Sequence, residues 1–390
     1  MSNGDDGEIW FGAPASSLTP LDADIASQEI ADLAERAREA GFVQTANLLE
    51  GSSPLANFLA AAFNLSPFLR DCARRWPGSL ERLYSVRLDD RLAELNILIR
   101  GLGILEGQTE TGLMKALREA KGEAHFLIAL AELAAVADAE ISVKRLSDLA
   151  DACVNAAIDF LLLDAHRSGK LNVADPAKPA DKSGWIILGM GKLGARELNF
   201  SSDIDLIVFF DPAAPAIPDP YESTDTFVRL TRRLVRILQD RTEHGYVFRT
   251  DLRLRPDPGS TPLAIPVEAA LIYYEGRGQN WERAAMIKAR PVAGDIGAGK
   301  AFLKELTPYV WRKYMDYAAI ADVHSIKRQI HAHKGHGEVA VKGHNVKLGR
   351  GGIREIEFFV QTQQLIAGGR FPELRGRETV PMLKVLAQRG

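Results

Sequence analysis

Two carboxylates one residue apart, Asp203 and Asp205, stand at the start of an otherwise apolar stretch that runs to Phe210. In a β-strand, residues i and i+2 lie on the same face, so both carboxylates would point to one side while Ile204 and Leu206 point to the other. Two like charges on one rigid face repel each other unless a cation lies between them. Mg²⁺ prefers hard oxygen ligands together with substrate phosphates, so the pattern predicts a magnesium site.

A glycine-rich segment lies just upstream, where Gly189-x-Gly191-x-x-Gly194 follows the apolar run 185–188. The spacing matches the dinucleotide fingerprint, but a Rossmann unit needs a crossover of about a dozen residues before its next parallel strand. Only residues 195–202 separate the last glycine from the next apolar stretch, which disfavours NAD binding. A Walker A loop is disfavoured as well, because Lys192 is followed by leucine rather than by Ser or Thr.

The remaining pattern is a glycine turn, a short helix and a Ser-Asp-x-Asp sequence at a strand. Backbone N–H groups of the turn and the ammonium group of Lys192 could hold the phosphates of a nucleotide while the aspartates hold a metal ion beside them. An Asp-x-Asp pair alone is weak support, since aspartates at strand ends are common and usually only solvated. A third carboxylate on a neighbouring strand would strengthen the hypothesis.

The segment Tyr246-Val-Phe-Arg-Thr-Asp-Leu-Arg-Leu-Arg255 supplies such a carboxylate. Its strict alternation predicts a strand with Arg249, Asp251, Arg253 and Arg255 on one face and apolar side chains on the other. One acid among three arginines could also form only a structural ion pair. Together with the first two aspartates, Asp251 is better explained as the third member of a carboxylate triad surrounded by phosphate-binding guanidinium groups.

Five sequence blocks together resemble a known family. They are Leu188-Gly-Met-Gly-Lys-Leu-Gly194, Glu197-Leu-Asn-Phe-Ser-Ser-Asp-Ile-Asp-Leu206, Asp251-Leu-Arg-Leu-Arg-Pro256, Trp281-Glu-Arg-Ala-Ala-Met-Ile-Lys-Ala-Arg290 and Lys347-Leu-Gly-Arg-Gly-Gly-Ile-Arg-Glu-Ile-Glu-Phe358. The first three resemble the nucleotidyltransferase fold of the polymerase β superfamily. The whole set is similar to the glutamine synthetase adenylyltransferase family, whose members are bifunctional adenylylating and adenylyl-removing enzymes. The resemblance covers the chain from about residue 185 to its end.

This resemblance implies an activity and a set of site residues. The implied reaction removes AMP from a tyrosine of adenylylated glutamine synthetase by phosphorolysis and releases ADP, with Mg²⁺ as cofactor. The implied catalytic and metal-binding residues are Asp203, Asp205 and Asp251. The expected nucleotide- and phosphate-binding residues are Gly189, Gly191, Lys192, Ser202, Arg249, Arg253, Arg255 and Arg350.

Two alternatives stay open at this point. The same triad could transfer an adenylyl group from ATP to glutamine synthetase, since microscopic reversibility allows either direction. The chain could instead be mainly a docking module for a PII-type signal protein, which governs this family. Three mutually repelling carboxylates argue against an inactive fold, because a binding module has no reason to keep them together.

The resemblance also implies how much of a larger protein is present. Family members carry two similar nucleotidyltransferase domains, and Asn-Phe-Ser-Ser-Asp-Ile-Asp resembles the first, adenylyl-removing copy. We therefore expect an N-terminal fragment of the bifunctional enzyme, mostly monomeric, whose last helix from Pro381 to Arg389 lacks its continuation. Elevated mobility is expected after about residue 370.

Composition narrows the class of protein. The 390 residues carry a net charge of −3, so no global field favours binding to nucleic acid. Cys72 and Cys153 are the only cysteines and are far apart in sequence, which is typical of a reducing compartment. The N-terminus is acidic and lacks an apolar signal core, and no apolar run is long enough to span a membrane. We expect a cytoplasmic protein with no membrane contact.

The chemistry must be positioned by several distinct regions, and the fold expected from them is α+β. Residues 1–20 resemble a flexible lead-in, and residues 21–173 form a helical domain with helical periodicity from Asp24 to about Lys170. Residues 174–300 form the nucleotidyltransferase core with a mixed β-sheet, entered through a proline-punctuated linker. Residues 301–390 begin a C-terminal helical bundle, which we expect to be truncated at Gly390.

Two further features carry weaker signals. Five histidines, His324, His331, His333, His336 and His344, gather in one stretch, but their spacing matches no zinc motif and neighbouring glycines indicate an exposed loop. The basic, glycine-rich turn 347–354 precedes a helix predicted from Glu355 to Ile366. Such a turn could place Arg350 and the helix N-terminus against an anion, or it could be a plain connection between helices.

Overall fold

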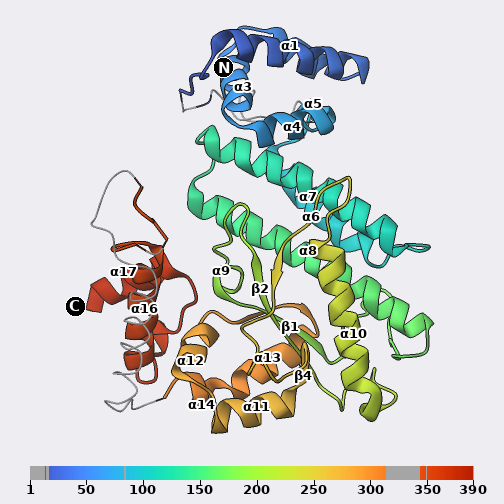
Figure 1. Cartoon of the computed structure of the whole chain (residues 1–390), viewed down its shortest axis with the longest axis vertical. Helices are drawn as coiled ribbons and strands as arrows, with labels where there is room; N and C mark the ends of the chain where they lie inside the picture. Colours follow the sequence, from blue (N-terminus) through green and yellow to red (C-terminus); the bar gives the residue numbers. More distant parts are fainter. Residues whose placement is uncertain (1–13, 15–16, 83–84, 313–342, 348, 390) are drawn as a thin grey trace, which may run out of the picture. The chain divides into compact units, whose positions relative to one another are not determined.

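The computed structural model describes residues 14, 17–82, 85–312, 343–347 and 349–389 (Figure 1). The chain divides into two compact units, and each is built from alternating stretches of sequence. The first unit contains residues 1–160, 198–202 and 237–248. The second unit contains residues 161–197, 203–236 and 249–390. The predicted domain boundaries at 20, 173 and 300 stay predictions.

The first unit is helical, as the periodicity predicted. Its helices are α1 (Ala23–Glu39), α2 (Val43–Glu50), α3 (Pro54–Leu65), α4 (Pro67–Arg75), α5 (Pro77–Arg82), α6 (Leu88–Leu102), α7 (Glu110–Leu133) and most of α8 (Ala139–Arg167). Several begin at N-cap side chains: Ser53 caps α3, Ser66 caps α4 and Thr109 caps α7. These oxygens accept from N–H groups that would otherwise lack partners in the first turn.

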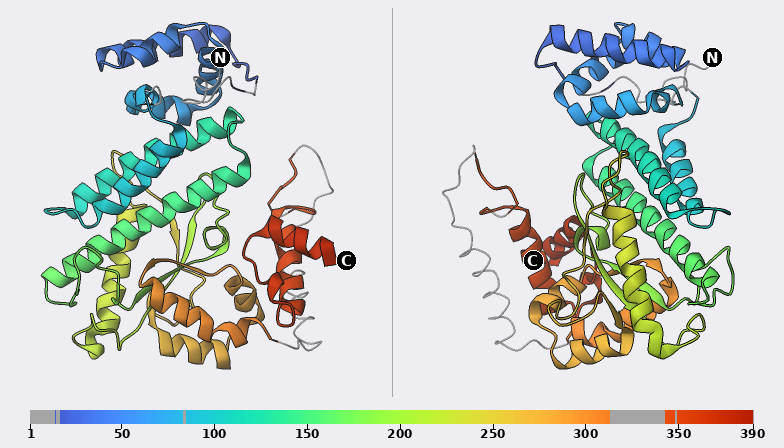
Figure 2. Two further views of the ribbon diagram at one scale, coloured as in Figure 1. Left: turned by 180° about the vertical axis from the view of Figure 1, so that it is seen from behind. Right: turned by 45° about the vertical axis from the view of Figure 1, so that its right-hand side comes forward.

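The long helices of the first unit pack through small residues and apolar rings. Helices α6 and α7 lie side by side (Figure 2). On α7, Gly122 lies against the Trp76 ring, where an added Cβ would approach a ring carbon to 2.0 Å. Phe63 of α3 and Phe126 of α7 stack at 6.2 Å between ring centroids, and neither is exposed. The close approach explains why a glycine interrupts an otherwise good helix-forming sequence.

The second unit is organised around a mixed sheet. Strand β1 (Trp185–Gly189) pairs antiparallel with β2 (Ile204–Phe210) and with β5 (Arg290–Gly294). Strand β2 also pairs in parallel with β3 (Thr250–Asp251) and with β4 (Ala264–Pro266). The α+β prediction with a mixed sheet is confirmed. The antiparallel β1–β2 pair also excludes the right-handed parallel crossover of a dinucleotide-binding unit.

Helices cover both faces of this sheet. Adjacent residues of β2 point to opposite faces, and Phe210 stacks on Phe227 of α10 (Pro220–Gln239) while Phe209 contacts Phe302 of α13 (Ile296–Glu305). Helices α11 (Val267–Gly276), α12 (Asn280–Met286) and α14 (Thr307–Val310) extend the second cluster. The remaining elements are α9 (Gly191–Gly194), α16 (Ile353–Ala367), the 3₁₀ turn η1 (Pro372–Leu374) and α17 (Thr379–Arg389).

The predicted strand over 246–255 is wrong, because only Thr250 and Asp251 pair with β2. The N–H groups of Val247 and Phe248 both donate to the carbonyl of Leu238 near the end of α10, at 2.9 and 3.0 Å. The N–H of Arg253 donates instead to the Asp251 side chain. The sequence does alternate, but the N–H groups of Val247, Phe248 and Arg253 donate to partners outside a strand ladder.

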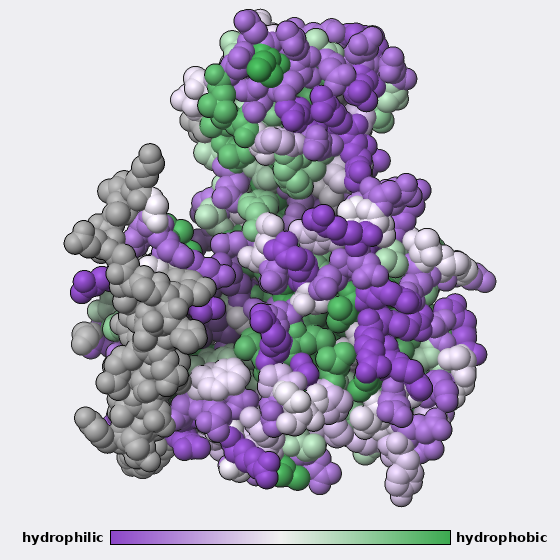
Figure 3. Space-filling model, viewed as in Figure 1, coloured by the Kyte–Doolittle hydropathy of each residue, from purple (hydrophilic) through white to green (hydrophobic). Residues whose placement is uncertain are grey.

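The surface is mixed in polarity. On the face that Figure 3 shows, hydrophilic side chains predominate and hydrophobic ones gather in small groups. Within the described ranges, no helix combines the length and hydrophobicity that crossing a bilayer requires.

Candidate active site in the second unit

The sheet register brings two of the predicted carboxylates together. Asp205 of β2 is the register partner of Asp251 on the adjacent parallel strand β3. Side chains of paired residues on neighbouring strands lie on the same face, so these carboxylates are neighbours. Asp203 comes immediately before β2, and the next residue, Ile204, donates its N–H to the Arg249 carbonyl at 2.9 Å. This hydrogen bond and the β2–β3 pairing hold the two backbone segments together next to the acids.

The glycine turn packs directly against Asp205. Met190 donates its N–H to the Asp205 carbonyl at 2.8 Å, and Gly191 follows with φ of +50° at the start of α9. A Cβ added to Gly191 would lie 2.9 Å from Asp205 Oδ2. A side chain at this position would therefore meet the carboxylate as well as adopting a disfavoured backbone conformation. The contact with Asp205 and the positive φ therefore explain why residue 191 is a glycine, which the fingerprint spacing alone does not explain.

Electrostatics distinguish the three acids. Burial, together with the negative charges of Asp251 and Asp203, raises the pKa of Asp205 to about 6. The charges of Lys347 and Arg253 oppose this rise. Arg253 lowers the pKa of Asp251 by donating hydrogen bonds to it from its side chain and its backbone. Asp203 forms an ion pair with Arg249. The site is therefore a place where negative charge is concentrated and needs cations.

The predicted phosphate-binding residues fall into two groups. Arg249 and Arg253 carry their guanidinium groups on the carboxylates, and Lys192 lies half-buried on α9. Gly189 ends β1, and Ser202 directly precedes Asp203. Arg255 differs, because its side chain donates to the carbonyls of Leu252 and Pro258 in its own loop. Sequence alternation placed Arg255 on the acid face, whereas the turn after Asp251 directs it to backbone oxygens.

The basic glycine turn before α16 approaches the same site. The charge of Lys347 lowers the pKa of Asp205, so this turn faces the carboxylates electrostatically. Helix α16 begins at Ile353, two residues before the predicted start. The N–H of Gly351 donates to the carboxylate of Glu355 at 2.7 Å, so a first-turn side chain already occupies part of the anion position. Arg350 is exposed, and its carbonyl oxygen lies 3.2 Å from His344 Nε2.

Sequence reasoning assigned no role to a second cluster that supports the site. Lys288 is 4% exposed, and its Nζ contacts Glu197 at 3.1 Å, Glu357 at 3.0 Å and the Thr379 hydroxyl at 3.1 Å. Arg290 donates to the carbonyls of Gly194 and Leu193, which end α9. Through the hydrogen bonds of Arg290, this cluster holds the end of the glycine turn in place. The signal for them was their presence inside the resembling sequence blocks, with partners that only the fold brings near.

A cavity adjoins Gly191 on the side of α12 and α16. Its volume is about 230 Å³, and its lining includes Leu254, Trp281, Lys288 and Phe358. Gly191 lines this cavity and also lies against Asp205, so a single residue connects the cavity wall to that carboxylate. Its aromatic and aliphatic walls suit a flat ring, while the acids and arginines suit metal and phosphate.

Metal-binding geometry is not preassembled. Among the residues that the structure describes, no group of three His, Cys, Asp or Glu side chains could hold a metal ion as positioned. Two of the acids are instead paired with Arg249 and Arg253. Four of the five clustered histidines, all except His344, lie outside the described residues.

Two family models match the chain. A model described as glutamate-ammonia ligase adenylyltransferase matches residues 56–305, and one described as GlnD PII-uridylyltransferase matches residues 324–390.

Curated relatives are named bifunctional glutamine synthetase adenylyltransferase/adenylyl-removing enzyme. The chain is 70% identical to the one from Mesorhizobium japonicum over 381 residues and 64% identical to the one from Brucella suis over 382 residues. Each alignment covers 98% of this chain and 39% of the relative. The relative from Rhizobium meliloti is 62% identical over 349 residues, which are 88% of this chain and 35% of the relative. The chain thus spans well under half the length of these relatives.

Proposed function

The chain belongs to the glutamate-ammonia ligase adenylyltransferase family, and on that premise we propose that it removes AMP from a tyrosine of adenylylated glutamine synthetase by phosphorolysis. The observation that carries the proposal is the register pairing of Asp205 with Asp251 beside Asp203, with the Gly191 turn packed on Asp205. This arrangement unites carboxylates with a glycine turn, as phosphoryl chemistry on a nucleotide requires. The names of the curated relatives support glutamine synthetase as the protein substrate.

The acids fit Mg²⁺ in donor type and in electrostatics. All three are carboxylates, and burial together with repulsion from Asp251 and Asp203 raises the pKa of Asp205 to about 6, so a cation at this point is favourable. Asp203, Asp205 and Asp251 would hold the ion, while Arg249 and Arg253 supply the positive charge beside two of these acids in the described structure. When bound, Mg²⁺ supplies Lewis-acid stabilisation of charge on phosphoryl oxygens.

The residues of the chain then have distinct tasks. Phosphate is the nucleophile: one of its oxygens forms a bond to the AMP phosphorus, the bond from that phosphorus to the tyrosine oxygen breaks, and ADP and tyrosine result. Arg249, Arg253 and Lys192 would bind and orient the attacking phosphate. Tyrosinate has a pKa of about 10 and is a fair leaving group, so the leaving oxygen needs no strong acid before it takes up a proton.

The cavity beside Gly191 would hold the adenine ring. Trp281 and Phe358 line it, and aromatic side chains stack well on bases. Trp281→Ala is expected to weaken binding of AMP or ADP about tenfold, in line with the cost of losing one stacking partner. Isothermal titration of the chain with ADP would measure this loss, and unchanged affinity would remove the cavity from the proposal.

The deciding experiment tests whether the chain removes AMP from glutamine synthetase or attaches AMP to it. The chain is incubated with adenylylated glutamine synthetase plus phosphate and Mg²⁺, and separately with unmodified glutamine synthetase plus ATP and Mg²⁺. ADP release in the first mixture supports removal, whereas incorporation of AMP in the second alone would establish forward transfer.

A variant pair ties the result to the carboxylates. Asp203→Asn is expected to lower the rate of AMP release by at least a hundredfold, because a site acid that acts on the transition state is lost. Asp211→Asn is the matched control, since Asp211 follows the opposite end of β2 and caps the turn at Ala213. Full activity in the first variant would sink the assignment.

Partners and location form part of the same proposal. The match of residues 324–390 to a model described as PII-uridylyltransferase supports a PII-type signal protein as a regulatory partner. Cys72 and Cys153 are buried free thiols, which supports a reducing cytoplasm. Calorimetric titration with a PII-type protein and size-exclusion chromatography would test the partner and the expected monomer.

A further inference from the structure

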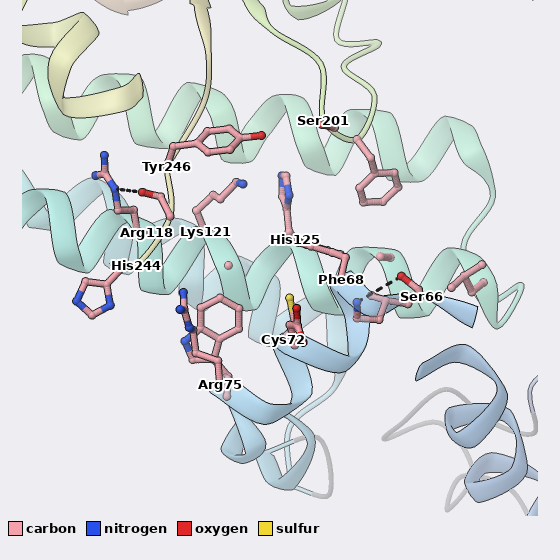
Figure 4. Close-up of a pocket in the computed structure, with 18 of the residues that line it drawn as sticks. Ser66, Phe68, Cys72, Arg75, Arg118, Lys121, His125, Ser201, His244 and Tyr246 are labelled. Carbon is pink, nitrogen blue, oxygen red and sulfur yellow. Dashed lines mark hydrogen bonds between the residues drawn. The ribbon is translucent and has the colours of Figure 1, made fainter. Parts of the chain in front are cut away.

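The first unit contains a partly open cavity that the proposed chemistry does not use. Its volume is about 870 Å³, and it lies between α4, α7 and the two short segments 198–202 and 237–248 (Figure 4). Every lining residue belongs to the first unit. The volume is within the range of about 300–1,000 Å³ that is typical of small-molecule sites.

The walls of this cavity are rich in flat apolar surface. Phe68, Trp76, Phe200 and Tyr246 all line it, and they come from α4, from its C-cap and from the two inserted segments. Aromatic walls contributed by separate parts of the chain favour a ring-shaped guest, since rings pack face to face or edge to face at close distance. The positions of these aromatic side chains thus favour a ligand that is both apolar and ring-shaped.

Positive charge predominates among the polar lining groups. Arg75, Arg118 and Lys121 line the cavity, against the acids Asp71 and Glu132. Arg118 is only 1% exposed, and its guanidinium donates to the carbonyls of Met114, Asp240 and Gly245 rather than to a carboxylate. The hydrogen bonds of this buried cation thus go to carbonyl oxygens, and the Asp240 carboxylate acts on it only through its charge, so positive charge remains at the cavity wall.

Lys121 brings a second cation to the same wall. Its Nζ lies 5.4 Å from the ring centroids of both Tyr246 and Phe248. The ammonium group therefore lies beside the aromatic wall. Figure 4 shows Lys121 and Tyr246 close together, next to His125.

His125 supplies an unmet hydrogen-bonding group. The residue is 6% exposed, and its Nε2 has no hydrogen-bond partner. Its ring contacts the edges of Phe200 and Phe248 at centroid distances of 6.0 and 5.9 Å. A buried polar atom without a partner is costly, so an unpaired nitrogen in a cavity wall points to a group that it would bind.

We propose that this cavity is a binding site for a small organic anion that carries an aromatic ring. The ring lies among Phe200, Tyr246 and Trp76, the anionic group lies near Lys121, and a polar atom of the ligand pairs with His125 Nε2. The site is separate from the carboxylate site, because no residue is common to the two. The inference stands whether or not the proposed reaction is correct.

The test uses the whole 390-residue chain and a matched pair of fluorescent probes. 8-Anilino-1-naphthalenesulfonate carries an anionic group on an aromatic body, and N-phenyl-1-naphthylamine is its neutral counterpart. Saturable binding of one sulfonate probe per chain is expected, about tenfold tighter than binding of the neutral probe, which is the usual effect of one charged contact. Absence of binding, equal affinity for the two probes, or several weak sites would overturn the proposal.

Variants locate the bound probe. Lys121→Gln is expected to lower affinity for the sulfonate about tenfold and to leave the neutral probe unaffected. Ala129→Phe fills the lining and is expected to abolish binding of both probes. Lys115→Gln is the control, because Lys115 lies on the same helix with 58% of its side chain exposed and does not line the cavity.

Circular dichroism accompanies each variant, and Lys121→Gln keeps the test decisive if the filled variant does not fold. Sulfonate affinity that is unchanged in Lys121→Gln would place the probe elsewhere and contradict the proposal.

Discussion

Lys288 is an ammonium group almost wholly removed from water and placed between two carboxylates. Glu197 precedes the acidic strand in sequence, and Glu357 comes from α16. Glu197 also accepts the Thr379 N–H at the start of α17. One charge thus joins three distant stretches of the second unit behind the glycine turn. Removing one partner of such a buried set leaves the other charges uncompensated.

Lys288→Met is therefore expected to destabilise the second unit by about 3–5 kcal/mol, the usual cost of breaking a buried ion pair. Urea unfolding, followed by tryptophan fluorescence, would measure the shift. Lys300→Met is the control, since Lys300 is exposed on α13 and a surface change costs at most about 0.5 kcal/mol. Equal effects of the two substitutions would contradict a buried ionic junction.

His125 makes the stability of the first unit depend on pH. Burial, followed by the charge of Lys121, lowers the pKa of the imidazole well below 6.5. The unfolded chain therefore binds a proton between pH of about 6.5 and the lower native pKa, while the folded chain does not. This contribution to stability is complete above pH of about 6.5 and is lost as pH falls below it, by up to about 1.4 kcal/mol per pH unit.

The matching variant is His125→Gln, which keeps a polar side chain and cannot titrate. The difference in unfolding free energy between the natural chain and the variant is expected to be constant above pH 6.5 and to shift against the natural chain in more acidic buffer. A difference independent of pH would mean that His125 is protonated equally in both states.

The three aspartates were predictable residue by residue, but Lys288 was not. Asp203, Asp205 and Asp251 are marked by strand periodicity and by spacing, which act over short stretches of sequence. The partners of Lys288 lie 91, 69 and 91 residues away, and no local pattern records such contacts. Arg255 shows the converse, because a turn redirected a side chain that periodicity had placed at the site.

At the scale of elements, the β1–α9 turn is the tightest part of the site. Gly191→Ala is expected to reduce AMP release strongly, because the new methyl group would stand 2.9 Å from Asp205 Oδ2 and displace the carboxylate. The positive φ adds a backbone cost of about 1–2 kcal/mol. Rate measurements together with thermal unfolding would separate the two effects.

Gly107→Ala provides the comparison for this substitution. Gly107 has φ of +71° and no atom within 4 Å of an added Cβ, so it carries the backbone cost without the contact. Similar thermal destabilisation but normal catalysis is expected of Gly107→Ala. A Gly191→Ala protein with a normal rate would show that the turn does not position Asp205.

The elements around this turn were predicted where local chemistry decides them. The short spacer between the glycines and the acids predicted at most a short helix before the acidic strand. The structure has β1, α9 and β2 in that order, with α9 formed by the glycine segment 191–194 itself and no helix in the spacer 195–202. The segment 246–255 was mispredicted because an alternating sequence specifies faces but not a pairing partner. Leu238 at the end of α10 takes the N–H groups of Val247 and Phe248, a non-local choice that periodicity does not encode.

At the scale of the molecule, the two thiols report on the opening of the helical unit. Burial raises the pKa of Cys72 and of Cys153 to about 12, so at pH 8 the reactive thiolate is scarce even apart from steric protection. Ellman's reagent is expected to leave both thiols unmodified in the folded chain and to titrate both in urea. Single variants Cys72→Ser and Cys153→Ser identify which thiol reacts first, and rapid reaction in native buffer would contradict the buried placement.

The alternation of the two units along the sequence has a consequence for biosynthesis. The long first stretch of the first unit ends at residue 160, yet the carbonyls of Asp240 and Gly245, which accept hydrogen bonds from Arg118, follow 80 and 85 residues later in the chain. At translation rates of about 5–20 residues per second, a nascent chain spends roughly 4–17 s with that guanidinium lacking two of its three carbonyl partners and with the segment 237–248 missing from the cavity wall. The ribosome thus delivers the first unit early and its closing segment late, and a chaperone that retains exposed helices would act within this interval.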